Sequence, residues 1–205
     1  RNAPYVAQLA SCFIEDSQKR TQYLAQINTE QKVRELPLCY VAPSFEKEMD
    51  RLAEIVGQRQ VMNERIGIIV STNRQLYGFA KGLEERGVTV EKAVARSDDN
   101  GFDFGNSVPK IVTYFSAKGL TFDSVLLPRL TESSFSWIGD STRMRLFFVG
   151  IARATQWVYL STVKGKEFSE IKIIHDAETN GHLTLQYTYD FNPKGTVGPR
   201  DESMD

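Results

Sequence analysis

Short apolar runs alternate along the chain with stretches in which apolar residues recur every three or four positions. The runs are continuous and often β-branched or aromatic, so they predict strands at 38–41, 66–70, 111–115, 124–127 and 157–161. The intervening stretches have helical spacing and predict helices at 4–14, 45–56, 73–86 and 143–153. Strands that alternate with helices of this length indicate a parallel sheet in a three-layer α/β fold.

Local signals predict where several elements begin and end. Ser44 is a typical N-cap, and Gly57 and Gly87 are expected to end two helices. Residues 18–31 are polar and weakly periodic, as in a helix end or a loop, and residues 88–94 are strand-like. Gly, Asp and Asn in 97–108 indicate a further loop.

The periodic signal weakens after Gly165. Residues 183–189 alternate between apolar and polar like an edge strand, and the composition of 192–205 predicts disorder. We therefore expect one α/β domain over 1–164 and a C-terminal extension over 165–205, with an edge strand and a disordered tail.

Composition and charge narrow the class of protein. The formal net charge is −1 over 205 residues, so any nucleic-acid contact requires a local patch or backbone donors. Cys12 and Cys39 lie in apolar runs, which favours buried free thiols in a reducing cytoplasm over a disulfide. No spacing predicts a metal site, and no signal peptide or apolar stretch of membrane-spanning length occurs.

Three polar segments are candidates for chemistry, because ligands of a parallel sheet gather at the carboxyl ends of its strands: 71–73, 113–123 and 143–154. Each also has a structural interpretation, namely helix capping, a corner between two strands, and an arginine that complements a helix dipole. The functional alternatives are a grip on phosphate, base stacking on Phe115, and an Arg153 charge offered to a phosphoryl group on a neighbouring domain.

The order of these segments favours the functional interpretation. Residues 113–128, which begin Thr-Tyr-Phe-Ser-Ala-Lys-Gly-Leu, resemble motif V of the UvrD/Rep-like superfamily 1 DNA helicases. Residues 145–154, Arg-Leu-Phe-Phe-Val-Gly-Ile-Ala-Arg-Ala, resemble motif VI. Residues 68–75 and the opening Arg-Asn-Ala-Pro are similar to two further family segments. The resemblance implies a RecA-like fold and the C-terminal motor domain of an ATP-dependent DNA helicase.

The resemblance also implies a role for individual residues. Family arginines that match Arg1 and Arg153 are catalytic, because they reach the γ-phosphate of ATP across the cleft between two domains. The positions expected near the nucleotide are Gly119, Thr121 and Lys118. The positions expected to face single-stranded DNA are Thr113, Phe115, Ser116, Thr72 and Asn73.

The sequence departs from the family pattern at two of these positions. Phe115 stands where the family usually has His, which exchanges a hydrogen bond for stacking, and Thr121 replaces a Glu that commonly contacts the ribose. The short 97–108 connection, where many relatives insert a helical subdomain, resembles a compact branch of the family.

The phosphate-binding half of a helicase motor is not encoded in the chain. The chain contains no Gly-x-x-x-x-Gly-Lys-Ser/Thr loop, which is the segment that binds ATP phosphates. We therefore expect ATP and Mg²⁺ to be held mainly by a first RecA-like domain outside this chain. We also expect the isolated chain to be inactive. A start at Arg1 instead of Met agrees with this expectation. One alternative stays open: a non-catalytic, helicase-derived module for nucleic-acid binding or interaction, which the changes at Phe115 and Thr121 favour.

Overall fold

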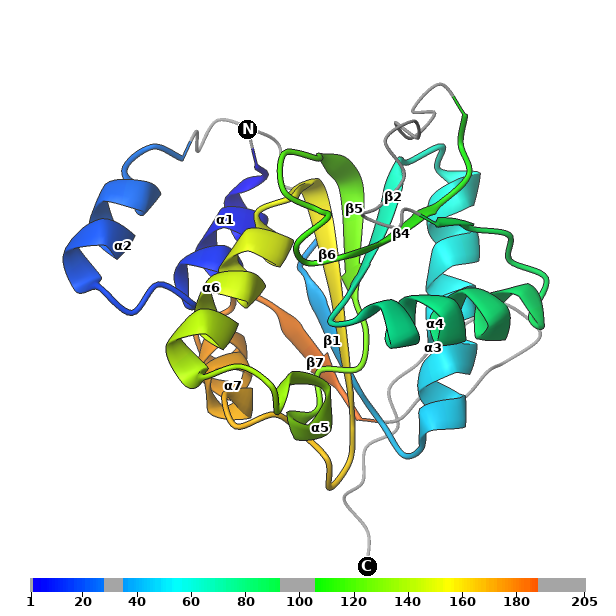
Figure 1. Ribbon diagram of the computed structural model, residues 1–205. Coiled ribbons are helices and arrows are strands. Elements are labelled where there is room, and N and C mark those ends of the chain that lie inside the picture. The colour runs from blue at the N-terminus through cyan, green and yellow to red at the C-terminus, as the bar shows by residue number, and fades with distance from the viewer. Residues whose placement is uncertain (1, 28–34, 93–105, 188–205) are drawn as a thin grey trace, which may run out of the picture.

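The computed structural model describes residues 2–27, 35–92 and 106–187, and their strands form one parallel sheet (Figure 1). The order across the sheet is β3-β4-β2-β5-β6-β1-β7, and all neighbours are parallel. The predicted parallel α/β sheet is therefore confirmed. The strands are Leu38–Ala42 (β1), Ile66–Val70 (β2), Glu91–Lys92 (β3), Lys110–Thr113 (β4), Phe122–Leu127 (β5), Ala154–Val163 (β6) and Thr184–Gln186 (β7).

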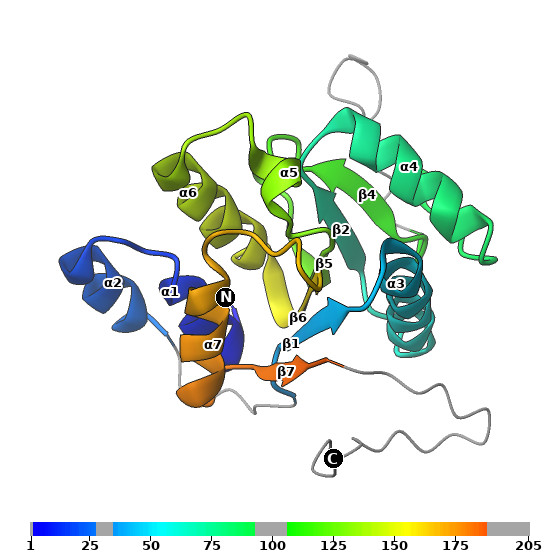
Figure 2. The ribbon, with the colours of Figure 1, turned by 90° about the horizontal axis from the view of Figure 1, so that it is seen from below.

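Helices cover both faces of the sheet, which gives the three predicted layers (Figures 1 and 2). One apolar core lies between the sheet and α3 and α4, and a second lies between the sheet and α1, α6 and α7. The helices are Pro4–Ser11 (α1), Ser17–Leu24 (α2), Phe45–Val61 (α3), Asn73–Glu84 (α4), Glu132–Phe135 (α5), Asp140–Ile151 (α6) and Ile171–Thr179 (α7).

Capping side chains begin the helices that cover the first face. Ser44 caps α3 by accepting a hydrogen bond from the Lys47 amide, as predicted. The prediction that Gly57 ends this helix is wrong, since α3 continues to Val61. Tertiary contacts hold its last turn: the Arg59 guanidinium lies 3.5 Å from the Trp157 ring centre and pairs with Glu64 at 3.6 Å. Those contacts outweigh the low helix propensity of one glycine, which costs about 1 kcal/mol.

Beyond β6, the chain adds α7 and then β7 at one edge of the sheet. The edge strand expected at 183–189 is confirmed over Thr184–Gln186, where it pairs with β1. The sequence does not predict α7, because only Ile174 and Ala177 are buried in it and the apolar pattern is sparse. The tail at 192–205 lies outside the described residues, and the boundary at 164 stays a prediction.

Candidate functional site

Parallel strands place the sequence-predicted site residues at two opposite edges of the sheet. The carboxyl edge, at the bottom of Figure 1 where α5 lies, is built by segments that follow β2, β4 and β5. The amino edge, at the top, holds the start of β5, the end of α6 and the first described residues of the chain. The connection from β4 to β5 runs from one edge to the other.

Thr113 and Phe115 lie at the carboxyl edge. β4 ends at Thr113, two residues earlier than the sequence predicts, so Phe115 falls in the following turn and its side chain is 61% exposed. The Thr113 hydroxyl donates to Ser116 Oγ at 3.1 Å and accepts from the Ser116 amide at 3.3 Å. The turn therefore projects an apolar ring into solvent from a rigid base.

Trp137 lies beside Phe115, and the sequence does not single it out. The two ring centres are 6.0 Å apart and the planes are tilted by 45°, and the Trp137 side chain is 48% exposed. Two large aromatic rings in contact at one exposed edge are a platform suited to stacking of flat ligands. A tryptophan within the serine-rich stretch 133–137 is the signal that could have identified it.

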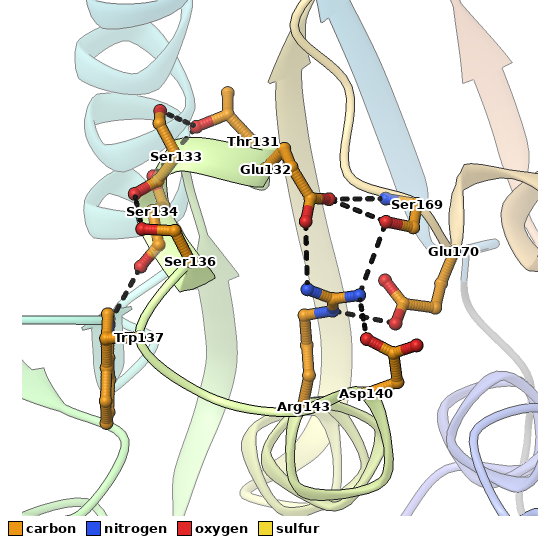
Figure 3. A network of polar contacts seen from close by, with 10 residues as sticks. All are labelled: Thr131, Glu132, Ser133, Ser134, Ser136, Trp137, Asp140, Arg143, Ser169 and Glu170. Carbon is orange, nitrogen blue, oxygen red and sulfur yellow. Dashed lines mark hydrogen bonds and ion pairs between the residues drawn. The ribbon is translucent and has the colours of Figure 1, made fainter.

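A polar network holds the segment that carries Trp137 (Figure 3). Arg143, 2% exposed, donates to Glu170 at 2.7 Å, Asp140 at 2.9 Å and Glu132 at 3.3 Å. The Trp137 indole N–H in turn donates to the Ser134 carbonyl at 3.2 Å. Arg143 therefore joins α5, α6 and the start of α7 into one support.

Thr72 and Asn73 lie at the same edge, after β2. Thr72 is the N-cap of α4 and accepts a hydrogen bond from the Gln75 amide at 3.2 Å, so the capping interpretation is observed for this residue. Asn73 is exposed beside it. Between α4 and α5 the surface opens into a cavity of about 630 Å³. It is lined by Met49, Ser71, Thr72, Arg74, Gln75, Gly78, Phe79, Arg129, Ser133, Ser134 and Trp137.

Arg153 and the 118–121 turn meet at the amino edge. The Arg153 guanidinium donates to the carbonyls of Val149 at 3.2 Å and Leu120 at 3.5 Å, and its own carbonyl accepts from the Phe122 amide. No carboxylate lies within ion-pair distance of it among the described residues. The remaining predicted residues, Lys118, Gly119 and Thr121, are exposed in the turn, where a φ of +85° at position 119 requires glycine.

The first described residues are fixed beside Arg153. The Asn2 amide donates to the carbonyls of Ala152 at 3.0 Å and Ala154 at 2.6 Å, and the Ala3 amide donates to the Thr155 carbonyl at 2.7 Å. Arg1 itself lies outside the described residues. Its neighbour is nevertheless held at the end of α6, so the chain brings positions far apart in sequence to one edge.

Asp123 links the strands of the amino edge. It receives the Arg65 guanidinium at 3.0 Å and the Thr155 hydroxyl at 3.2 Å. Burial alone would raise the pKa of this carboxyl, but the hydrogen bonds and charge of Arg65 outweigh it and lower the pKa to about 2.

The Asp123 carboxylate predicts an acid-dependent loss of stability. A carboxyl with a depressed pKa stabilises the fold above its ordinary pKa of 3.8, and this contribution is lost as the pH falls towards 2. Asp123→Asn should therefore lower the free energy of unfolding by about 1–2 kcal/mol at pH 7 and by much less near pH 2. Urea unfolding of both proteins across that range measures the difference, and a gap that does not change with pH would contradict this role.

Other classes of site are not supported in the described part of the chain. No group of three or more His, Cys, Asp or Glu side chains there could hold a metal ion, and no helix there is long and apolar enough to cross a membrane. Cys39 is buried and Cys12 half-buried, and both are free.

Comparison with known proteins places this geometry in context. Residues 89–165 match the UvrD-like helicase C-terminal domain family. The structure is similar to the C-terminal domain of a possible DNA helicase from Lactobacillus plantarum WCFS1, with a TM-score of 0.66 and 17% identity over 90% of this chain and 97% of that one. It is also similar to the C-terminal domain of the DEAD-box protein Dbp5, with a TM-score of 0.51 and 16% identity over 75% of this chain and 89% of that one. No curated protein sequence matches the chain.

Proposed function

We propose that the chain is the second motor domain of an ATP-dependent DNA helicase, because residues 89–165 match the UvrD-like helicase C-terminal domain family. The observation that carries the proposal is the connection from β4 to β5. It begins with Thr113 and Phe115 at the carboxyl edge and ends with Gly119 and Thr121 beside Arg153 at the amino edge. One short segment thereby joins a surface for a nucleic-acid strand to a surface for a nucleotide.

At the amino edge, Arg153 supplies charge to a phosphate that another domain holds. An arginine whose hydrogen-bond partners in the described part of the chain are carbonyls keeps its charge for an anion, which is what an arginine finger requires. The resemblance to the helicase family assigns a second such charge to Arg1, which precedes Asn2 in the chain. Lys118, Gly119 and Thr121 complete the surface towards the nucleotide. ATP and Mg²⁺ bind mainly to a first RecA-like domain, since the chain has no phosphate-binding loop.

At the carboxyl edge, the Phe115–Trp137 platform stacks bases of single-stranded DNA. Stacking tolerates any base sequence, which suits a motor that moves along a strand. Ser116, Thr72 and Asn73 offer hydroxyl and amide groups to the sugar–phosphate backbone nearby, and the buried Thr113 hydroxyl positions Ser116. Closing and opening of the cleft between the two domains would then move the strand past this edge.

Binding of a labelled single-stranded oligonucleotide tests this surface. Phe115→Ala and Trp137→Ala are each expected to weaken binding about tenfold, since stacking on one aromatic side chain contributes about 1–3 kcal/mol per base. Tyr187→Ala is the matched control, because Tyr187 is 51% exposed but follows β7 at the far edge of the sheet. Equal affinities for all four proteins would exclude the platform.

A non-catalytic nucleic-acid-binding module is the second candidate. The exposed Thr121, in place of the family's usual Glu, favours it by removing a carboxylate from the nucleotide surface. The reading frame upstream of the chain separates the two candidates. A phosphate-binding loop encoded there supports the motor, and a frame without one supports the module.

A further inference from the structure

Arg129 adopts a backbone conformation that is unusual for its residue type. It follows β5 with a φ of +59°, in the left-handed region that side chains other than glycine rarely occupy. Such a conformation costs about 1 kcal/mol or more and persists only where surrounding contacts impose it. Here Glu48 imposes it: the Arg129 amide donates to its carboxylate at 2.7 Å and the guanidinium Nε donates to the second oxygen.

These contacts fix the guanidinium in one orientation. Glu48 is fully buried, and it also accepts a hydrogen bond from the Ser161 hydroxyl at 2.8 Å. The guanidinium carbon of Arg129 lies 4.1 Å from the Phe45 ring centre and 5.0 Å from that of Phe79. Its two terminal amino groups have no hydrogen-bond partner among the described residues, and the side chain remains 20% exposed. A rigid pair of donors is therefore left available.

The available donors belong to the wall of the 630 Å³ cavity between α4 and α5. Arg74 lines the same cavity from the first turn of α4, and Thr72 and Ser133 add hydroxyl groups. The lining contains two arginines and no acidic residue, although the whole chain carries a net charge of −1. Glu48 compensates the charge of Arg129, whereas Arg74 has no carboxylate partner among the described residues and gives the cavity its positive charge. The planar fork of a fixed arginine suits the oxygen pair of a phosphate.

We propose that this cavity binds a backbone phosphate of the single strand whose bases stack on Phe115 and Trp137. The identity of the strand rests on the proposed function, whereas the anion site rests on the cavity itself. Trp137 joins the two, because it lines the cavity and contacts Phe115. Arg129 is the fixed donor of the site and Arg74, which is exposed, is the adjustable one.

A purely structural role for Arg129, as counter-charge for Glu48, makes a different prediction. Lysine at 129 still neutralises Glu48, but its single ammonium group is then occupied and no fork remains for a phosphate. Arg129→Lys therefore separates the two roles without leaving a buried carboxylate unpaired. Circular dichroism and thermal unfolding verify that the variant is folded.

Oligonucleotide affinity measured over a range of salt concentrations tests the site. We expect Arg129→Lys to bind about tenfold more weakly, and Arg74→Ala to reduce the slope of log affinity against log salt by about 0.7, the value for one lost phosphate contact on a single strand. Lys81→Ala is the matched control: Lys81 is on the same helix, its side chain is 79% exposed, and its loss changes the charge equally. The Lys81→Ala variant should have the same oligonucleotide affinity and the same salt dependence as the wild type.

The outcomes separate this inference from the proposed function. If Phe115→Ala weakens binding while both arginine variants match Lys81→Ala, the phosphate site is wrong and the stacking platform stands. If the wild-type chain binds no single-stranded oligonucleotide, the phosphate site for the strand and the stacking platform are both wrong. Thermal unfolding with and without inorganic phosphate, at matched ionic strength, tests whether the cavity binds free phosphate. Thermal stabilisation by phosphate that Arg129→Lys abolishes, with unchanged oligonucleotide affinity, would assign the cavity to free phosphate and overturn the strand assignment.

Discussion

Replacing Arg153 with alanine is expected to lower ATP turnover by the full-length protein about a thousandfold or more, while nucleotide binding is retained. The side chain sits at the amino edge, held by the carbonyls of Val149 and Leu120 and by no carboxylate among the described residues. Under the proposed function, its charge acts when negative charge develops on the transferred phosphoryl group, and much less when ATP first binds.

Steady-state hydrolysis and fluorescent-nucleotide binding measure the two effects separately. Lys172→Ala serves as the control, since Lys172 is an exposed cation in the first turn of α7, which lies at the carboxyl end of the sheet and not at the amino edge that carries Arg153. Turnover by Arg153→Ala within about tenfold of the wild type would contradict the assignment, because arginine fingers contribute far more than that.

Replacing Arg143 with alanine is expected to lower the free energy of unfolding by about 3–5 kcal/mol, a large share of the 5–15 kcal/mol of an ordinary domain. The guanidinium is 2% exposed and pairs with three carboxylates (Figure 3). Glu132 and Asp140 are 54% and 85% exposed, so water replaces Arg143 around them readily. Most of the loss arises at Glu170, whose side chain is 11% exposed and is left without its partner.

Urea unfolding checks this value, with Arg145→Ala as the control on the same helix. Arg145 is exposed, so its removal should change stability by no more than about 0.5 kcal/mol. A loss below about 1 kcal/mol for Arg143→Ala would mean that the carboxylate cluster is solvated and does not support α5. A loss in the expected range, together with weaker oligonucleotide binding, would link the cluster to the position of Trp137.

The hydrophobic pattern predicts most of the fold because parallel strands buried on both faces are continuous apolar runs, as Ile66–Val70 shows. The pattern fails where contacts between residues far apart in the sequence determine the bounds of an element. Helix α3 passes Gly57 because Arg59 stacks on Trp157, and no local signal reveals that partner. α7 is missed because it buries only two residues fully.

The sequence predicts which motifs carry the candidate site, but not how the fold arranges their residues in space. The resemblance to motifs V and VI singles out Phe115 and Arg153, yet their separation to opposite edges follows from strand direction and from the course of the β4–β5 connection. Trp137 and Arg129 lie outside the motifs. Their roles depend on a ring contact at 6.0 Å and on a buried carboxylate from α3, both of which are long-range. Sequence order alone cannot supply such pairings, because each joins segments that only the folded sheet brings together.

Strand-stimulated ATP hydrolysis by the full-length protein tests most directly whether the two edges of the sheet belong to one motor. Single-stranded DNA is expected to raise the hydrolysis rate of the wild type. Phe115→Ala should reach the same maximal rate only at about tenfold higher DNA concentration, because it loses stacking and keeps the arginine charge. A hydrolysis rate that is indifferent to DNA, or one that responds equally in both proteins, would contradict the coupling of these two edges.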